Sequence, residues 1–210
     1  MKKTIIYLFS VLVISSGISS CKKTNANKIS GDWTISNFTE TSTSSSGSET
    51  VTIDGNVISI DDGSSVTTGN VTSAAMSFDK EGTWTQSIGY SVDYSGTGFT
   101  AIITYTMENS GTWSFVGKNK SAELKANDRI VLSTLSTTTT DVTAYTIAGV
   151  TTEDTNTSMD TYNEGEETQT LLVESSSKSE FVCSANESNT STYNGSSTTN
   201  STISSWTLTK

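Results

Sequence analysis

Apolar and polar residues alternate along most of this 210-residue chain, and this period of two limits the fold more than any other feature. Two runs show it clearly, with the apolar sets Trp84, Ile88, Tyr90, Val92, Tyr94 and Phe99, Ala101, Ile103, Tyr105, Met107. Within each run the set lies on one face of an extended chain. No stretch of a dozen residues carries the apolar stripe of an amphipathic helix. The pattern predicts an almost entirely β protein.

Short turn sequences separate the alternating segments, which favours antiparallel neighbours. The expected strands are residues 32–41, 50–60, 71–78, 83–94, 99–107, 112–116, 122–126, 129–139, 142–147, 168–174, 180–185 and 203–209. A long antiparallel meander hides its edges by closing, so we expect an up-and-down β-barrel, with a β-sandwich as the alternative. We expect the acidic stretch 153–167 to form a long, mobile hairpin tip, and the Gly, Asn and Ser mixtures within 184–202 to form loops.

The composition excludes several classes of function. The chain contains no His, so imidazole catalysis and His-ligated metal sites are absent. Its formal net charge of −10 disfavours nucleic acid as a partner, because phosphate binding needs clustered basic residues. Neighbouring carboxylates such as Asp61 and Asp62 point to opposite faces of a strand and make no catalytic pair. We expect a protein that is not an enzyme and has no cofactor.

The acidic stretch begins like a calcium-binding loop but departs from it at two required positions. Met159 and Gly165 stand where such a loop needs Gly and Glu, so an EF-hand is rejected. We expect a solvated acidic loop without a metal site here. The alternative is a loose surface calcium site at Glu164, Glu166 and Glu167.

The N-terminus has the layout of an export signal. Lys2 and Lys3 precede an apolar run of about ten residues, and small residues follow as far as Ser20. The sequence Ile18-Ser19-Ser20-Cys21 resembles the lipobox of bacterial lipoprotein precursors. The resemblance implies cleavage before Cys21 and acylation of its thiol, whereas an ordinary signal peptide followed by a chance Cys is the alternative. The expected organisation is a signal peptide (1–20), a lipidated N-terminus with a short tether (21–29) and one barrel domain (30–210).

Each of the two cysteines has a separate expected fate. Acylation of Cys21 leaves Cys183 without a disulfide partner. Cys183 falls on the apolar face of an alternating segment, so we expect a buried, inert thiol.

Three Gly-x-Trp sequences, at Trp33, Trp84 and Trp113, place Gly at a turn exit and Trp two residues into a strand. Gly lets the backbone turn, and the Trp ring that follows can plug one end of a barrel. We expect Trp33 to have this role. Gly31-x-Trp33 on the opening strand resembles the G-x-W hallmark of lipocalins. The chain also has the lipobox, the segment from Phe78 to Trp84 and the final segment from Trp206. With these features combined, it is similar to bacterial lipocalin-like lipoproteins.

The lipocalin resemblance implies a cavity for a small hydrophobic molecule. The residues expected to line it are Trp84, Tyr90, Tyr105, Trp113 and Phe115, unless these rings simply fill the core. The T-D-Y-like second motif and C-terminal helix of lipocalins are not visible, and no position matches the Arg that packs on the first-strand Trp. The only Arg, Arg129, is expected on an exposed strand face.

The expected function is that of a lipid-anchored protein of the bacterial cell envelope, at the outer membrane, whose barrel binds or carries a small hydrophobic molecule. The expected partners are membrane lipid through acylated Cys21 and that small molecule. The alternative is a surface or periplasmic interaction module with a filled core that contacts a protein or glycan.

Overall fold

The computed structural model describes residues 26–117, 127–193 and 196–210, and it is built almost entirely of β-strands. The elements are a single helical turn, α2 (Ala26–Ile29), followed by β1 (Gly31–Ser44), β2 (Gly47–Asp54), β3 (Val57–Asp61), β4 (Val66–Phe78), β5 (Thr83–Asp93), β6 (Phe99–Val116), β7 (Asp128–Ile147), β8 (Val150–Thr161), β9 (Glu167–Ser176), β10 (Glu180–Tyr193) and β11 (Ser196–Thr209). The prediction of an all-β chain is confirmed.

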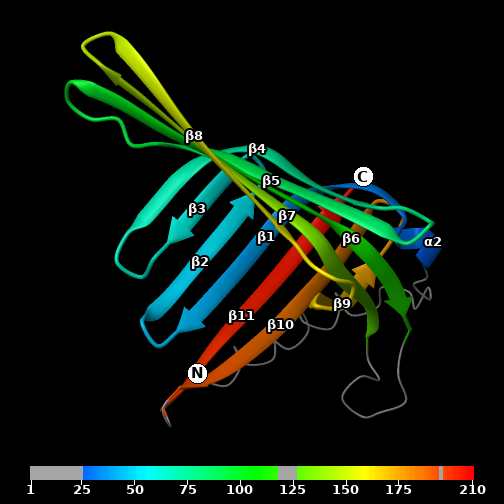
Figure 1. The fold of residues 1–210 in the computed structure, drawn as a ribbon. Coiled ribbons are helices and arrows are strands. Elements are labelled where there is room, and N and C mark those ends of the chain that lie inside the picture. Colours follow the sequence, from blue (N-terminus) through cyan, green and yellow to red (C-terminus); the bar gives the residue numbers. More distant parts are fainter. Residues whose placement is uncertain (1–25, 118–126, 194–195) are drawn as a thin grey trace, which may run out of the picture.

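The strands form an antiparallel barrel, which confirms the expected fold class. In the described part of the chain, ten strands close a ring in the order β6-β5-β4-β3-β2-β1-β11-β10-β9-β7, and β6 pairs with β7 along its whole length to seal it. β8 lies outside the ring and pairs with β7 only. Figure 1 shows the ends of β6, β7 and β8 projecting together beyond the barrel at the upper left.

The barrel is narrow at one end and wide at the other. At the narrow end β1 pairs directly with β4, from Gly31 with Phe78 to Thr34 with Ala75. A register shift between Ile35 and Asn37 follows, and β1 then pairs with β2. The β2–β3 hairpin therefore enters the wall only toward the wide end, which we call the mouth.

The wall is also open along one seam, between β9 and β10. Their pairing stops where Ser184 meets Leu172, although β10 runs on to Tyr193 and β9 begins at Glu167. Over the same height β7 changes partner from β9 to β8. The barrel is thus sealed around the narrow end and split on one side near the mouth.

Aromatic rings pack the narrow end. The ring of Phe78 lies 5.3 Å from that of Trp113 and 6.4 Å from that of Phe181, and Phe181 lies 5.9 Å from Trp33. Complete burial of each such side chain contributes about 1.5–3 kcal/mol relative to exposure. Below them Ile29 is fully buried, so α2 covers this end.

Several strand boundaries differ from the predictions. The expected strand 50–60 is two strands, because residues 55–56 make the turn between β2 and β3. The expected pairs 99–107 with 112–116, and 129–139 with 142–147, are the single strands β6 and β7. The expected strand 122–126 lies outside the described residues.

Two segments expected to lack regular structure are paired. The acidic stretch 153–167 is largely β8, which pairs with β7 from Val150 to Thr161. The polar segment 184–202 belongs mostly to the hairpin of β10 and β11. Both predictions were wrong for the same reason: a neighbouring strand supplies backbone hydrogen bonds, and Thr and Ser tolerate a solvated strand face.

Candidate functional site

A cavity of about 450 Å³ lies inside the barrel between the aromatic narrow end and the mouth. This volume is in the range of small-molecule sites. The residues that line it come from β1 to β7, from β9 to β11 and from the turn before β9: Phe38, Glu40, Val51, Ile53, Ile58, Met76, Trp84, Gln86, Ile88, Tyr90, Tyr105, Met107, Asn109, Leu132, Thr134, Thr137, Tyr162, Glu167, Thr168, Gln169, Glu187 and Trp206.

The half of the cavity nearest the narrow end is largely apolar, and its polar residues are uncharged. Ile53, Ile58 and Leu132 are each exposed by only about 1% of their surface, and their side chains form its wall. Across it, the rings of Phe38 and Trp206 lie 5.6 Å apart, on paired positions of β1 and β11. This half offers no charged group, and it suits a hydrocarbon portion of a ligand.

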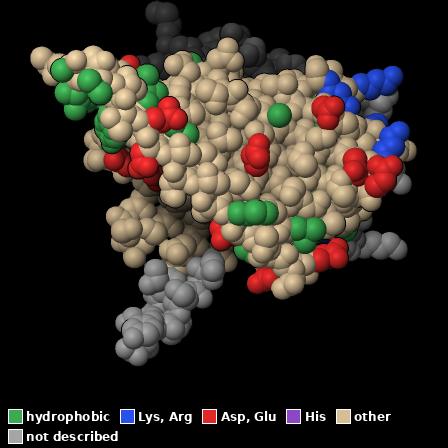
Figure 2. Space-filling model, turned by 45° about the horizontal axis from the view of Figure 1, so that its top comes forward, with side chains coloured by type: hydrophobic (Ala, Val, Ile, Leu, Met, Phe, Trp, Pro, Cys, Tyr) green, Lys and Arg blue, Asp and Glu red, His purple; other side chains and the backbone are tan. Residues whose placement is uncertain are grey.

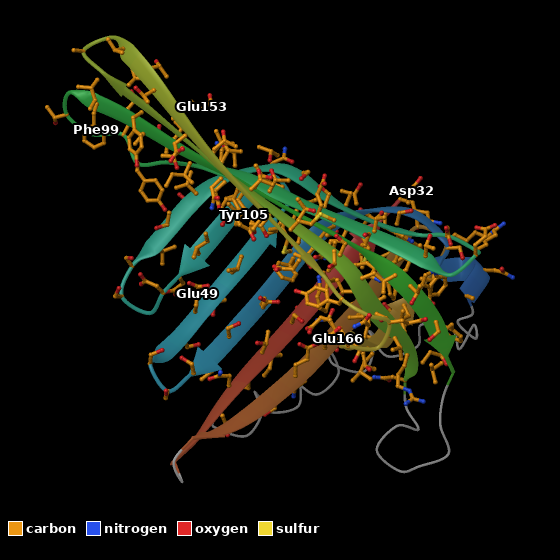
Figure 3. The ribbon with its side chains drawn as sticks, in the orientation of Figure 1. Asp32, Glu49, Phe99, Tyr105, Glu153 and Glu166 are labelled. Atoms are coloured by element: carbon orange, nitrogen blue, oxygen red, sulfur yellow. The ribbon has the colours of Figure 1, made fainter. Side chains whose placement is uncertain are left out.

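Two tyrosines stand at mid-height in the wall. Tyr90 on β5 and Tyr105 on β6 are register partners, and their rings stack with centroids 5.1 Å apart. Burial, together with the charges of Tyr105 and Asp141, raises the pKa of Tyr90 to about 12, so its phenol is neutral at physiological pH. Both tyrosines line the cavity, and Figure 3 labels Tyr105.

A row of hydrogen-bonded polar side chains crosses the wall four residues nearer the narrow end than the two tyrosines. Asn109 Nδ2 donates to Gln86 Oε1 at 2.9 Å, and Thr137 Oγ1 donates to Asn109 Oδ1 at 2.8 Å. The three residues lie on the adjacent strands β5, β6 and β7. Mutual bonding lets Gln86 be buried in the wall without leaving its carbonyl oxygen unpaired.

Carboxylates surround the cavity toward the mouth. Glu40 on β1, Glu187 on β10 and Glu167 on β9 line it, and Glu49 lies two residues from cavity-lining Val51 on the same face of β2. Burial raises the pKa of Glu40, and the negative charges of Glu187 and Glu49 raise it further. Among the described residues, no lysine or arginine lines the cavity.

One buried donor in the cavity wall has no partner. Trp206 is 4% exposed, and its indole Nε1–H makes no hydrogen bond. The other three tryptophans each donate to a backbone carbonyl: Trp33 to Ile29, Trp84 to Ser133 and Trp113 to Asp79. A buried donor without an acceptor carries a free-energy cost, which an acceptor in the cavity would relieve.

The residues predicted to line a cavity divide between two places. Trp84, Tyr90 and Tyr105 line it, as drawn for Tyr105 in Figure 3. Trp113 and Phe115 do not, because β6 carries them past the cavity to the narrow end. There Trp113 packs on Phe78, and half-buried Phe115 packs against the core.

Trp33 lies at the narrow end, as a plug of the barrel would. It is 2% exposed, and its Nε1–H donates to the carbonyl of Ile29 at 2.6 Å. The cation over its ring is Lys210, whose Nζ lies 4.4 Å from the ring centroid and donates to the carbonyl of Ser30. Arg129 is half-buried on β7 and donates to the carbonyl of Gly117, so it does not serve Trp33.

The most informative residues that sequence reasoning missed are Glu40, Glu187, Gln86 and Trp206. Two of them carried a usable signal: Glu40 follows Phe38 by two positions, and Glu187 follows buried Ala185 by two. Alternation therefore places both carboxylates on the inner face, where charge is unexpected and informative. The lack of a partner for Trp206 is a property of packing that alternation does not show.

The described residues also bear on the metal and thiol chemistry that the sequence raised. Within the described ranges, no group of three or more Cys, Asp or Glu side chains is arranged to hold a metal ion. In the segment considered for calcium, Glu164 accepts a hydrogen bond from Thr112 and Glu166 accepts one from the backbone of Asn163. The Cys183 thiol is fully buried and burial raises its pKa, so it is a poor nucleophile. None of the described helices is long and apolar enough to span a bilayer.

Comparison with family models, curated proteins and solved structures found no match for this chain. The description of the fold as a lipocalin-like barrel therefore rests on the strand pairing. The expected signal peptide, Cys21 and the start of the expected tether lie outside the described residues.

Proposed function

We propose that this chain is a lipid-anchored protein of the bacterial cell envelope whose barrel binds a small amphipathic molecule. The observation that carries the proposal is the cavity, which joins an apolar inner half to a polar mouth. A barrel whose core were filled by its own side chains would leave no such space. The function is binding or carriage rather than catalysis.

The anchor is proposed from the lipobox-like sequence at Cys21. The first described residue, Ala26, lies five positions later in α2, and Ile29 of that turn is buried at the narrow end. A tether this short holds the narrow end toward the bilayer. The mouth then faces away from the membrane, toward the compartment from which a ligand arrives.

Membrane fractionation tests the anchor. Expressed in a bacterium that processes lipoproteins, the wild-type chain is expected in the membrane fraction and the Cys21→Ser variant in the soluble fraction, because the variant lacks the acylated thiol. A matched Cys183→Ser variant keeps the anchor and should stay with the membrane. Membrane retention of Cys21→Ser without detergent would contradict the anchor.

Native mass spectrometry of the soluble Cys21→Ser protein tests the cavity. An additional mass that disappears on denaturation supports an occupied barrel and reports the size of the ligand. A mass equal to the bare chain, unchanged after incubation with a lipid extract of the host, contradicts the proposal.

A second candidate function rests on the protrusion formed by the outer ends of β6, β7 and β8. Phe99, Tyr145, Ile147 and Val150 there are exposed by 43%, 48%, 61% and 68%. Figure 2 shows apolar side chains gathered at this projecting end, at the upper left. Exposed apolar clusters favour protein contacts, so the barrel would be an interaction module. Cross-linking on intact cells that yields one partner with wild type and none with an Ile147→Ser, Val150→Ser variant supports this reading, and equal yields contradict it.

A further inference from the structure

The mouth of the cavity carries negative charge without compensation from described residues. Glu40, Glu187 and Glu167 line the cavity from three strands, and exposed Glu49 lies beside it, on the same face of β2 as cavity-lining Val51. Burial, and then the negative charges of Glu187 and Glu49, raise the pKa of Glu40. A positive charge among these carboxylates would remove that repulsion, and nothing described in the chain supplies one.

The rings beside the carboxylates favour the same kind of partner. Phe38 and Glu40 are adjacent inward positions on β1, and the ring of Phe38 packs on Trp206 at 5.6 Å. Tyr90 and Tyr105 offer stacked rings on the opposite wall. Aromatic faces attract ammonium groups, because the ring quadrupole is negative at its face.

The unpaired indole of Trp206 is a separate indication that the site is built for a ligand. It lines the cavity, it is more than nine-tenths buried, and its Nε1–H has no acceptor. The carboxylates cannot explain it, because none of them accepts this hydrogen bond. Because Nε1 is enclosed by the wall, an uncharged oxygen of a bound molecule, such as a hydroxyl, ether or ester oxygen, would accept this hydrogen bond only after a local shift of the neighbouring side chains.

We propose that the ligand of this barrel is a cationic amphiphile: a hydrocarbon chain in the apolar half of the cavity and an ammonium group among Glu40, Glu49 and Glu187 at the mouth. This inference rests on the proposed binding function and adds the charge of the ligand. It disfavours fatty acids and other anionic lipids, whose headgroups would meet the same carboxylates.

The experiment compares probes that share one tail and differ in the headgroup. Isothermal titration calorimetry at neutral pH and low ionic strength measures decyltrimethylammonium, decanoate and tetraethylene glycol monodecyl ether, all below their micelle concentrations. Tetramethylammonium is the probe without a tail. We expect decyltrimethylammonium to bind about tenfold more tightly than the neutral ether, decanoate to bind more weakly than either, and tetramethylammonium to bind weakest.

Variants locate the effect. In Glu40→Gln, Glu187→Gln the advantage of the cationic probe over the neutral ether should shrink to about twofold or less, because the variant removes two of the carboxylates at the mouth. The matched control is Glu153→Gln, which removes one charge from exposed β8, outside the cavity (Figure 3). It should keep the cationic preference.

The outcomes separate the two proposals. Equal binding of the three tailed probes, or a preference for decanoate, overturns the charge assignment and leaves the binding function standing. Equally tight binding of tetramethylammonium overturns the role of the hydrocarbon chain. No binding of any probe to a protein with a wild-type melting temperature overturns both.

Discussion

Gly111 shows how a single residue lets the barrel close. A Cβ atom added at Gly111 would lie 1.9 Å from the carbonyl oxygen of Ser133 on β7 and 2.9 Å from Nε1 of Trp84. The backbones of β6 and β7 approach this closely at the register shift between Ser110 and Gly111. Trp84 uses the same carbonyl of Ser133 as its hydrogen-bond acceptor. Gly111 is therefore required because the neighbouring strand leaves no room for a Cβ atom, and not because of its backbone angles.

We predict that Gly111→Ala lowers the free energy of unfolding by about 2–3 kcal/mol, because the methyl group pushes apart the strands that seal the ring. Chemical denaturation measures the change. Gly117→Ala is the control, since the nearest atom to its added Cβ is 3.9 Å away, and it should change stability little. Equal stability of Gly111→Ala and wild type would mean that β6 and β7 are not held this closely.

Glu40 is the residue that makes the mouth sensitive to pH. Its pKa is raised in the folded protein, through burial first and then through Glu187 and Glu49; Glu167 also lines this space. The folded state therefore holds the Glu40 proton more tightly than the unfolded state does. The protonated Glu40 side chain therefore contributes to the free energy of unfolding. This contribution is fully present below the ordinary glutamate pKa and is lost as the pH rises through the raised pKa.

We predict that Glu40→Gln melts a few degrees higher than wild type at neutral pH, because the variant has no buried carboxyl to ionise. The two proteins should converge in melting temperature as the pH falls below the ordinary glutamate pKa. Thermal melts across the pH range measure this. A variant that is less stable at neutral pH would mean that the Glu40 carboxylate has a favourable partner in the protein.

Among the described elements, β8 differs from every strand of the ring because one of its edges is free along its whole length. Its twelve residues are all exposed, and it pairs only with β7. Glu153, Asp154 and Asp160 place charges along it, which discourages pairing with other chains. The strand holds its place through one ladder of backbone hydrogen bonds and through Thr side chains such as Thr157, which bonds to Thr140.

We predict that the amides of β8 exchange with solvent at least tenfold faster than those of β6, which has a partner strand on each side. Hydrogen exchange followed by mass spectrometry of peptides resolves the two strands. The first part of β7, which pairs with β6 and β9, is the slow reference within the same molecule. Slow exchange of β8 would show that another chain covers its edge.

At the scale of the whole molecule, the barrel has two compartments, and its tryptophans divide between them. Trp33 and Trp113 lie in the narrow end, whereas Trp84 and Trp206 line the cavity. A bound molecule therefore contacts one pair and not the other. The seam between β9 and β10, with Thr168 and Glu187 on either side, provides an opening besides the mouth.

We predict that an amphiphile in the cavity shifts the emission of Trp84 and Trp206 and leaves that of Trp33 and Trp113 unchanged. Variants in which one cavity tryptophan is Phe should lose part of the shift, and Trp113→Phe should keep all of it. An equal response of the narrow-end rings would place the ligand elsewhere.

The sequence by itself determined the class of fold and the inner face of most strands. Period-two alternation is a local property: it decides which side chains of a strand share a face, and it identified Trp84, Tyr90 and Tyr105 correctly as inward residues. It also determined that imidazole chemistry is absent. It could not tell how high in the barrel an inward residue lies, so Trp113 and Phe115 were predicted in the cavity although they belong to the narrow end.

Only the tertiary structure decided where strands begin, which edges stay open and which charges meet. The register between β1, β2 and β10 brings Glu40, Glu49 and Glu187 together from positions up to 147 apart along the chain. It also places Lys210 over Trp33, the last residue of the chain beside an early one. Such contacts depend on hydrogen-bond register between distant strands, and a pattern that repeats every two residues is the same in many registers.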